Sequence, residues 1–290
     1  MLAMKRWIVL LVVVAAVLLA ACAPRPFDAS SPWNTPLGAV GWRDEPLLRS
    51  GHSWVNDESF SIPVVRSGPG DPLVNVSVPS SWGWAGGVVQ VNIPDGVGGA
   101  AGGDGTLVVV EGNAVYDFYQ FNRTGPNLGS ASAWAATFQN GPGWGRPNPF
   151  LGAGIRAAGS SSLGGLITSG DIVGGDDFRH ALAVSLLGSE VSNSHVAPAI
   201  AGGGGSGTIP IGARIGIPAG TPMPGGLSPI GVRMWNTLAR YGAYVVDQHG
   251  GSAPVTFYAD PRSVGADKVA PLRNPGGDLD RIMPAVRVVQ

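Results

Sequence analysis

The chain has 290 residues, of which only 13% are charged, and its net charge at pH 7 is −1. A chain without a basic excess lacks the electrostatic signature of nucleic-acid binding, so we expect no nucleic-acid partner. Its 46 glycines and 25 prolines make up about a quarter of the residues, which approaches the composition of low-complexity chains. Nine tryptophans and recurring valine and isoleucine runs instead indicate a folded, turn-rich β protein.

The first 21 residues resemble a bacterial lipoprotein signal peptide. Lys5 and Arg6 precede an apolar stretch, 7–20, which is shorter than the roughly 20 residues of a transmembrane helix and fits a secretory signal. The segment ends Leu19-Ala20-Ala21-Cys22, similar to the lipobox, in which cleavage precedes a cysteine that is then lipidated. Because Cys22 is the only cysteine, we expect an extracytoplasmic lipoprotein without disulfides, anchored through this lipid to the outer membrane or the cell surface. A plain signal peptide with a chance cysteine is the alternative.

The remaining residues divide into a tether and one domain. Residues 22–36 are rich in proline and serine, and a single domain is expected over 37–290. Short β-rich runs recur there between glycines and prolines, which is typical of an all-β fold, an antiparallel β-sandwich or jelly roll. We expect it to be a monomer. The predicted strands are 61–66, 73–78, 87–93, 106–111, 114–121, 132–138, 181–187, 243–247 and 254–258.

Two local motifs are specific. The strands 106–111 and 114–121 flank the turn Glu111-Gly112-Asn113, which predicts a hairpin. One α-helix is predicted over 228–241, because Ser228 can cap it, Pro229 suits the first helical position and Gly242 suits the position after its end.

The strand that follows the hairpin turn is the richest candidate binding surface. In a regular strand Asp117, Tyr119 and Arg123 share one face and Tyr116 lies on the other. Buried charges need partners, so the first face suits a sugar-binding groove better than a core. We expect Tyr119, Arg123, Tyr116 and, from a later strand, Trp134 to contact substrate. The alternative for the strand is a solvent-exposed surface without a ligand, and the alternative for Trp134 is packing in the core.

Two further residues are candidates for catalysis. Asp247 ends an apolar strand ahead of a glycine-containing loop, a common position for site residues, although it could also cap a turn. His180 stands at the start of the apolar strand 181–187 and titrates near neutral pH. It can act as a base or orient another group, or be a hydrogen-bonded structural histidine. Arg179 points to the opposite face of a regular strand, which leaves only His180 for a cleft.

Motifs for phosphate binding, serine hydrolysis and zinc proteolysis are absent from the sequence. The four histidines show no metal-ligand spacing, so we expect no cofactor. The acidic turn Gly174-Gly-Asp-Asp177 leaves a structural calcium site open.

An ordered set of short motifs spans nearly the whole mature chain. The motifs are Ser31-Pro-Trp-Asn-Thr-Pro36, Val115-Tyr-Asp-Phe-Tyr119, Gly164-Gly-Leu-Ile167, His180-Ala-Leu182, Val196-Ala-Pro-Ala199, Pro210-Ile-Gly-Ala-Arg214 and Leu238-Ala-Arg-Tyr-Gly242 with Asp247. Their order resembles a widespread family of secreted bacterial proteins of uncharacterised activity, frequent in actinobacteria. This chain departs from the family pattern at Asp117, where Glu is usual, and at Arg214-Ile-Gly216, where a second Arg is usual. The resemblance implies a shared fold more than a reaction.

These residues together predict an enzyme that acts on a polysaccharide or cell-surface glycan. As a glycoside hydrolase it would use Asp117 and Asp247, with carboxyls roughly 5–10 Å apart, and His180 would orient or tune one of them. As a polysaccharide lyase it would use Tyr119 or His180 as base and Arg123 to neutralise a uronate. A non-catalytic carbohydrate- or surface-binding lipoprotein is the third hypothesis.

Overall fold

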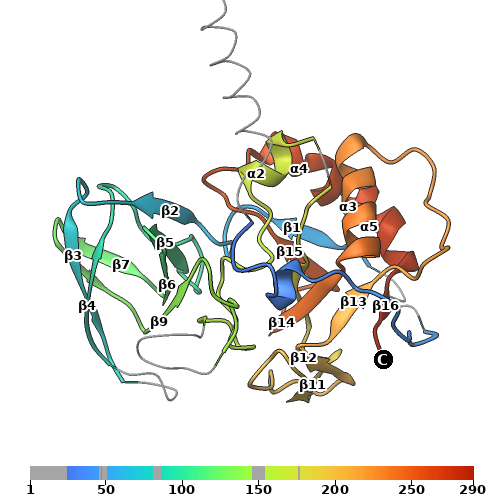
Figure 1. Cartoon of the computed structure of the whole chain (residues 1–290), viewed down its shortest axis with the longest axis horizontal. Helices are drawn as coiled ribbons and strands as arrows, with labels where there is room; N and C mark the ends of the chain where they lie inside the picture. The colour runs from blue at the N-terminus through green and yellow to red at the C-terminus, as the bar shows by residue number, and fades with distance from the viewer. Residues whose placement is uncertain (1–24, 46, 48–50, 81–85, 146–153, 176) are drawn as a thin grey trace, which may run out of the picture.

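The computed structural model describes residues 25–45, 47, 51–80, 86–145, 154–175 and 177–290 (Figure 1). The predicted signal peptide, Cys22 and Asp176 lie outside the described residues. Two parts lie side by side in Figure 1, one built of two four-stranded sheets and the other of a six-stranded sheet with helices. With 32% strand and 15% helix, the β-rich class is confirmed. Within the described ranges no helix is long and apolar enough to cross a membrane.

The two four-stranded sheets share an apolar core. One sheet has the order β2 (Val64–Ser67), β5 (Leu107–Glu111), β6 (Ala114–Tyr119) and β9 (Ala133–Phe138); the other has the order β4 (Gly87–Asn92), β3 (Leu73–Val78), β8 (Leu128–Ser130) and β7 (Asn122–Gly125). Alternate residues of a strand point to opposite faces, so Val74 and Val76 of β3 pack with Val109 of β5 and Phe118 of β6. The predicted hairpin is confirmed, because β5 and β6 pair antiparallel from Glu111 opposite Ala114.

The sheet β2-β5-β6-β9 is buried on both faces. While Val109 faces the four-stranded partner, Val108 and Val110 belong to the second core, which includes the six-stranded sheet. Two-sided burial explains why β5 reads as a continuous apolar run. The second face of this sheet also carries Asp117 and Tyr119, and it is here that the two parts of the molecule meet.

The six-stranded sheet mixes parallel and antiparallel pairs. Its order is β1 (Trp54–Asn56), β15 (Val255–Tyr258), β10 (Leu182–Leu187), β14 (Ala243–His249), β13 (Arg214–Gly216) and β16 (Arg287–Val288); β11 (Val191–His195) and β12 (Ile209–Ile211) form a small separate sheet. The central strands β10 and β14 run parallel, which requires a crossover connection between them. The prediction of one antiparallel sandwich over 37–290 therefore does not describe this part.

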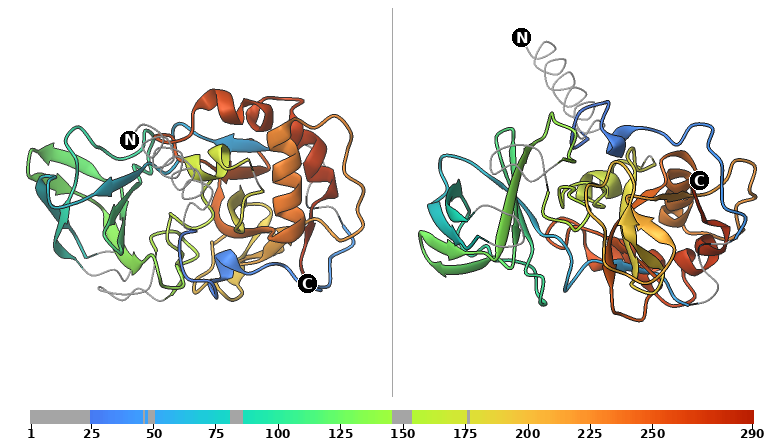
Figure 2. Two further views of the ribbon diagram at one scale, coloured as in Figure 1. Left: turned by 45° about the horizontal axis from the view of Figure 1, so that its top comes forward. Right: turned by 90° about the horizontal axis from the view of Figure 1, so that it is seen from below.

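Helices accompany the six-stranded sheet and leave the four-stranded sheets without helical cover (Figure 2). They are α2 (Ser169–Val173), α3 (Pro229–Arg240), α4 (Ala266–Arg273) and α5 (Asp278–Ile282), with short 3-10 turns η1 (Pro32–Asn34) and η2 (Met283–Ala285). The predicted helix is confirmed as α3: the Ser228 hydroxyl accepts from Gly231 N at 3.2 Å, and Gly242 follows with φ of 66°. The prediction of a single helix missed α4, which contains Pro271 and buries only Val269 and Leu272.

The described part of the predicted tether is folded. Trp33 is 1% exposed and stacks on Trp144 with ring centroids 4.8 Å apart. The Asn34 amide donates to the Asp28 carbonyl at 2.8 Å, and Phe27 lies in the core. Residues 27–36 therefore belong to the body of the protein rather than to a tether.

Candidate functional site

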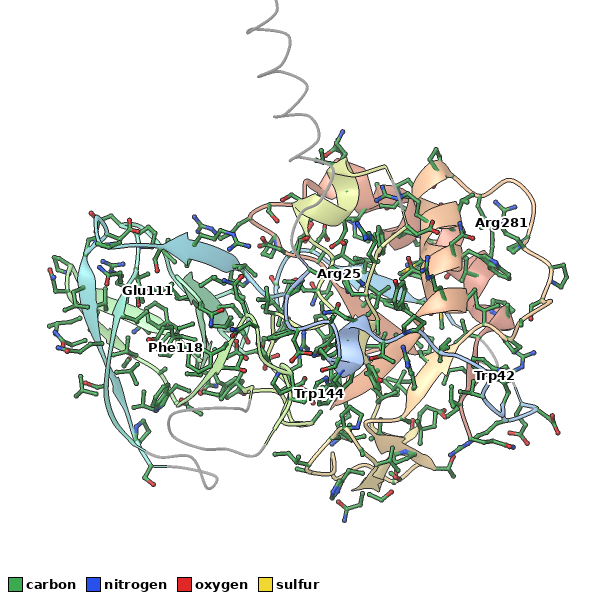
Figure 3. All side chains as sticks on the ribbon, viewed as in Figure 1. Arg25, Trp42, Glu111, Phe118, Trp144 and Arg281 are labelled. Atoms are coloured by element: carbon green, nitrogen blue, oxygen red, sulfur yellow. The ribbon has the colours of Figure 1, made fainter. Side chains whose placement is uncertain are left out.

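A pocket of about 500 Å³ lies at the junction of the two parts and is lined by both polar and apolar side chains. We call it the Arg156 pocket. Trp144, labelled in Figure 3, also lies at this junction. The β6 side contributes Tyr119, β14 contributes Asp247, β15 contributes Tyr258, and a glycine- and serine-rich loop contributes Arg156. Because separate elements supply each side chain, the pocket exists only in the assembled fold.

Asp247 reaches the pocket from the end of a buried strand. The first four residues of β14 are buried and Asp247 is the first that is not. The β10–β14 register shifts so that Val184 pairs with Val245 and Ser185 with Asp247, and such a bulge redirects a side chain. Burial raises the pKa of Asp247 to about 6, against the effects of the Gln248 N–H and Arg156. This carboxyl can therefore hold a proton near neutral pH.

Asp117 lies beneath the pocket rather than in it. It is 1% exposed and is not among the residues that line the cavity. One carboxylate oxygen accepts from Ser162 N at 2.7 Å and from Ile155 N at 3.4 Å, and the other accepts from the Ser161 hydroxyl at 3.2 Å. Burial raises its pKa to about 6 while these donors and Arg156 oppose the rise. Its contacts make Asp117 a positioning residue for the loop that carries Arg156.

Arg156 interacts electrostatically with three acids of the site, and the sequence analysis does not predict it. Its side chain is 6% exposed and its guanidinium carbon lies 4.5 Å from the Tyr258 ring centroid. It lowers the pKa of Asp104, Asp117 and Asp247 alike. Arg156 is the only charged residue between Gly154 and Gly165. A single charge in a run of small residues was the one available signal.

Three more ionisable side chains line the pocket: Asp104, Tyr119 and Tyr258. Asp104 is exposed, and partial burial raises its pKa against the effect of Arg156. Burial also raises the pKa of Tyr119, as do Asp104 and Asp247. Tyr258 is affected in the same direction, chiefly by burial. At neutral pH both phenols are therefore protonated donors.

Arg123 lies elsewhere, which corrects its predicted role. Gln120 has a φ of 54°, in the left-handed region that interrupts a regular strand. After it, Phe121 enters the core between the four-stranded sheets and Arg123 falls on β7 of the second sheet. Its guanidinium donates to the Pro94 carbonyl at 2.9 Å and to Asp95 at 3.3 Å. Arg123 thus holds a loop and does not line the pocket.

His180 is also placed outside the pocket. Its Nδ1 lies 2.9 Å from the Ala181 carbonyl and its Nε2 lies 3.2 Å from Asp171. Burial opposes the charged form, but the Asp171 carboxylate outweighs it and raises the pKa of His180. The prediction that His180 orients Asp117 or Asp247 is therefore wrong. It belongs instead to a buried ion pair between α2 and the start of β10.

Tyr116 and Trp134 face away from the pocket. Tyr116 alternates with Asp117 as predicted, and both aromatic rings pack against the core between the four-stranded sheets. They line a separate groove together with Val88 and Phe138. Of the four predicted substrate contacts, only Tyr119 lies in the Arg156 pocket.

Within the described residues, no group of three or more His, Cys, Asp or Glu side chains is arranged to hold a metal ion. In the acidic turn considered for calcium, Asp177 accepts instead from the Asn236 amide at 3.0 Å.

The comparisons with known proteins assign the chain to no family. No protein-family model matches the chain, and neither the curated proteins nor the solved structures contain a match. Function must therefore be argued from the chemistry of the pocket alone.

Proposed function

We propose that this chain is an extracytoplasmic, polysaccharide-degrading enzyme, a glycoside hydrolase whose active site is the Arg156 pocket. The observation that carries the proposal is Asp247, a pocket-lining carboxyl with a pKa of about 6. A carboxylic acid whose pKa is raised to about 6 is half protonated at that pH and can protonate a departing glycosidic oxygen. Its exposed neighbour Asp104 lines the same pocket.

In this proposal the two pocket carboxyls divide the work. Asp247 donates its proton to the leaving oxygen, while ionised Asp104 acts as base or nucleophile on the opposite side of the sugar. The negative charge of Asp104 helps to raise the pKa of Asp247, which supports their proximity. Asp117, which was expected to be half of the catalytic pair, instead holds the Arg156 loop through Ser161 and Ser162.

A polysaccharide lyase is the second candidate, because an arginine and two tyrosines share the pocket. In that reaction a tyrosine removes the proton next to a uronate carboxyl. The raised pKa values of Tyr119 and Tyr258 make the phenolate scarce at neutral pH, and this favours hydrolysis. Lyase products are unsaturated and absorb ultraviolet light, whereas hydrolase products do not.

The proposal also includes the setting of the enzyme. We infer that the two four-stranded sheets form a β-sandwich, that the chain acts as a monomer, and that a lipid on Cys22 anchors it to a membrane. Changing Cys22→Ala should move the protein from the membrane fraction to the soluble fraction. Membrane retention of the variant would overturn the anchoring proposal.

Digestion of a glycan panel, read by mass spectrometry, tests the activity. Wild type should shorten at least one glycan, and Asp247→Asn should do so at least about 100-fold more slowly. Asp267→Asn is the matched control, since the Asp267 side chain is 73% exposed and lies outside the pocket. Equal cleavage by Asp247→Asn and wild type would overturn the assignment, and binding without cleavage by wild type would favour a non-catalytic lipoprotein.

A further inference from the structure

Two nitrogens on one edge of the Arg156 guanidinium have no hydrogen-bond partner among the described residues. Within the described part of the chain, its Nε and Nη2 are buried and have no hydrogen-bond partner. These two nitrogens lie on the same side of the planar group, so their N–H bonds run parallel. We call this pair the open edge of Arg156. It is the arrangement that grips a carboxylate with two hydrogen bonds.

The neighbouring acids do not occupy the open edge. The Asp117 oxygens accept from Ser161, Ser162 and Ile155, and one Asp247 oxygen accepts from Gln248 N at 2.8 Å. A buried donor without a partner costs free energy. Arg156 is 6% exposed, lines a pocket and keeps two unpaired donors, so an acceptor that enters beside it would relieve this cost.

We propose that Arg156 binds the carboxylate of an acidic sugar, so that the polysaccharide taken by this pocket contains uronate residues. The inference rests on the proposed function and names its substrate class. A planar carboxylate presents two oxygens at the spacing of the open edge. Both neutral sugars and methyl-esterified uronates lack this charge.

The rim of the pocket offers a surface for the sugar ring. Phe60 lines the pocket, is 49% exposed and has a φ of 62°, a conformation that side chains rarely adopt. Its ring packs on the backbone of Gly102, where an added Cβ would lie 2.9 Å from the ring. Phe60 thus adds a half-exposed aromatic ring to the pocket lining, and such rings are apolar platforms on which a sugar can stack.

Bound uronate should also change protonation in the pocket. The ionisable groups that face Arg156 are Asp104, Asp117, Asp247 and Tyr258. A further negative charge makes ionisation of these groups harder, so the complex holds more protons than the free protein. Binding must then strengthen as pH falls. Since uronate binding favours protonated Asp247, the substrate itself would prepare the acid that cleaves it.

Titration with single sugars tests the inference without catalysis. D-galacturonate, D-glucuronate and D-mannuronate contain no glycosidic bond to cut, and each has a methyl ester of nearly the same shape. Binding to wild type is followed by NMR at pH 5.5 and 7.5. At least one uronate should bind about 10- to 100-fold more tightly than its ester, and more tightly at the lower pH.

Protein variants locate the interaction. Arg156→Met should reduce the preference for uronate over ester to near unity. Arg156→Lys keeps a positive charge without the paired donors and should retain only part of the preference. Arg66→Met is the control, because Arg66 is an exposed arginine on β2 and its loss should change nothing.

The outcomes separate this inference from the proposed function. Equal binding of uronate and ester by wild type, binding of neither, or an unchanged preference in Arg156→Met would each overturn the inference. Cleavage of a neutral glycan that depends on Asp247 would still uphold the hydrolase. Conversely, Arg156-dependent uronate binding without any cleavage would uphold the inference and reject the hydrolase.

Discussion

Two clusters of buried charged side chains in the described part of the chain differ in how completely the charges are paired. At the corner between α2 and β10, both ring nitrogens of His180 have acceptors, Asp171 and Ala181, and Asp171 also accepts from Thr168. At the junction of the two parts, Arg156 keeps two donors open. The first cluster is closed and stabilises the fold. The second keeps two unpaired donors, and for this reason we propose it as the ligand site.

The largest expected effect separates the two clusters by activity. Asp247→Asn should lower kcat on a cleavable glycan about 10²- to 10⁴-fold, because it removes general acid catalysis. His180→Ala should leave kcat of the folded protein within about threefold of wild type, because His180 is outside the pocket. Steady-state rates of both purified variants test this. A large loss of kcat in folded His180→Ala would contradict the distinction.

The free energy of unfolding should depend strongly on the Asp171–His180 pair, although catalysis should not. Asp171→Asn should reduce the free energy of unfolding by about 3 kcal/mol, since removing one partner leaves the other buried charge unpaired. Denaturant titration with circular dichroism measures the change. His249→Ala is a suitable comparison, because His249 is only partly buried and a change below about 1 kcal/mol is expected there. Equal small effects for both variants would show that the buried pair is unimportant.

The pH dependence of stability should also differ. The pKa values of Asp117 and Asp247 rise to about 6 in the folded state, so the folded protein binds more protons and loses stability as pH rises from about 4 to 6. Asp247→Asn should flatten this decline by up to about 2 kcal/mol. Melting temperatures across this range test it, and an unchanged slope would contradict the raised pKa.

For the cluster of His180 and Asp171, stability rises rather than falls as pH increases through the acidic range. Because the pKa of His180 is raised and that of Asp171 is lowered, the pair stabilises the fold when both are charged. The Asp171 contribution is lost as pH falls below about 4, and the His180 contribution is lost as pH rises above about 6.5. The difference in stability between wild type and His180→Ala should therefore shrink at high pH. A difference that stays constant from pH 6 to 10 would contradict this assignment.

The smallest expected effect is that of Asp117, which positions the loop of Arg156 but does not line the pocket. Asp117→Asn retains one acceptor oxygen but loses the other, so it should cost about 1–3 kcal/mol of stability and raise KM for acidic glycans more than it lowers kcat. Thermal melts and steady-state kinetics on the same preparation separate the two. Loss of kcat as large as in Asp247→Asn would make Asp117 catalytic after all.

Individual strands and the helix α3 could be predicted from the sequence, because residue alternation and capping residues depend only on neighbouring positions. The strand 73–78 alternates buried and exposed residues and was predicted at the bounds of β3, and Ser228, Pro229 and Gly242 predicted α3. Asp247 was predicted because it ends an apolar strand, and Tyr119 because it shares a strand face with Asp117. The structure brings both into one pocket.

The rest depended on long-range packing. Parallel pairing of β10 with β14 is not encoded in the periodicity of either strand. Strand alternation places Arg123 beside Tyr119 only if the strand continues regularly through Gln120, where the left-handed backbone instead leads the chain to another sheet. Arg156 stands in a loop without periodicity, so no sequence pattern identifies it. The contact between Asp117 and this loop forms only when β6 and the loop pack together.

Digestion of a uronate-containing glycan in heavy-oxygen-labelled water, read by mass spectrometry, tests the central claim most directly. Hydrolysis through Asp247 predicts one heavy oxygen atom in the products for each bond cut by wild type, and at least about 100-fold less labelled product from Asp247→Asn in the same time. Unlabelled, unsaturated products would contradict the account by revealing a lyase, and intact glycan would show that the Arg156 pocket binds without cutting.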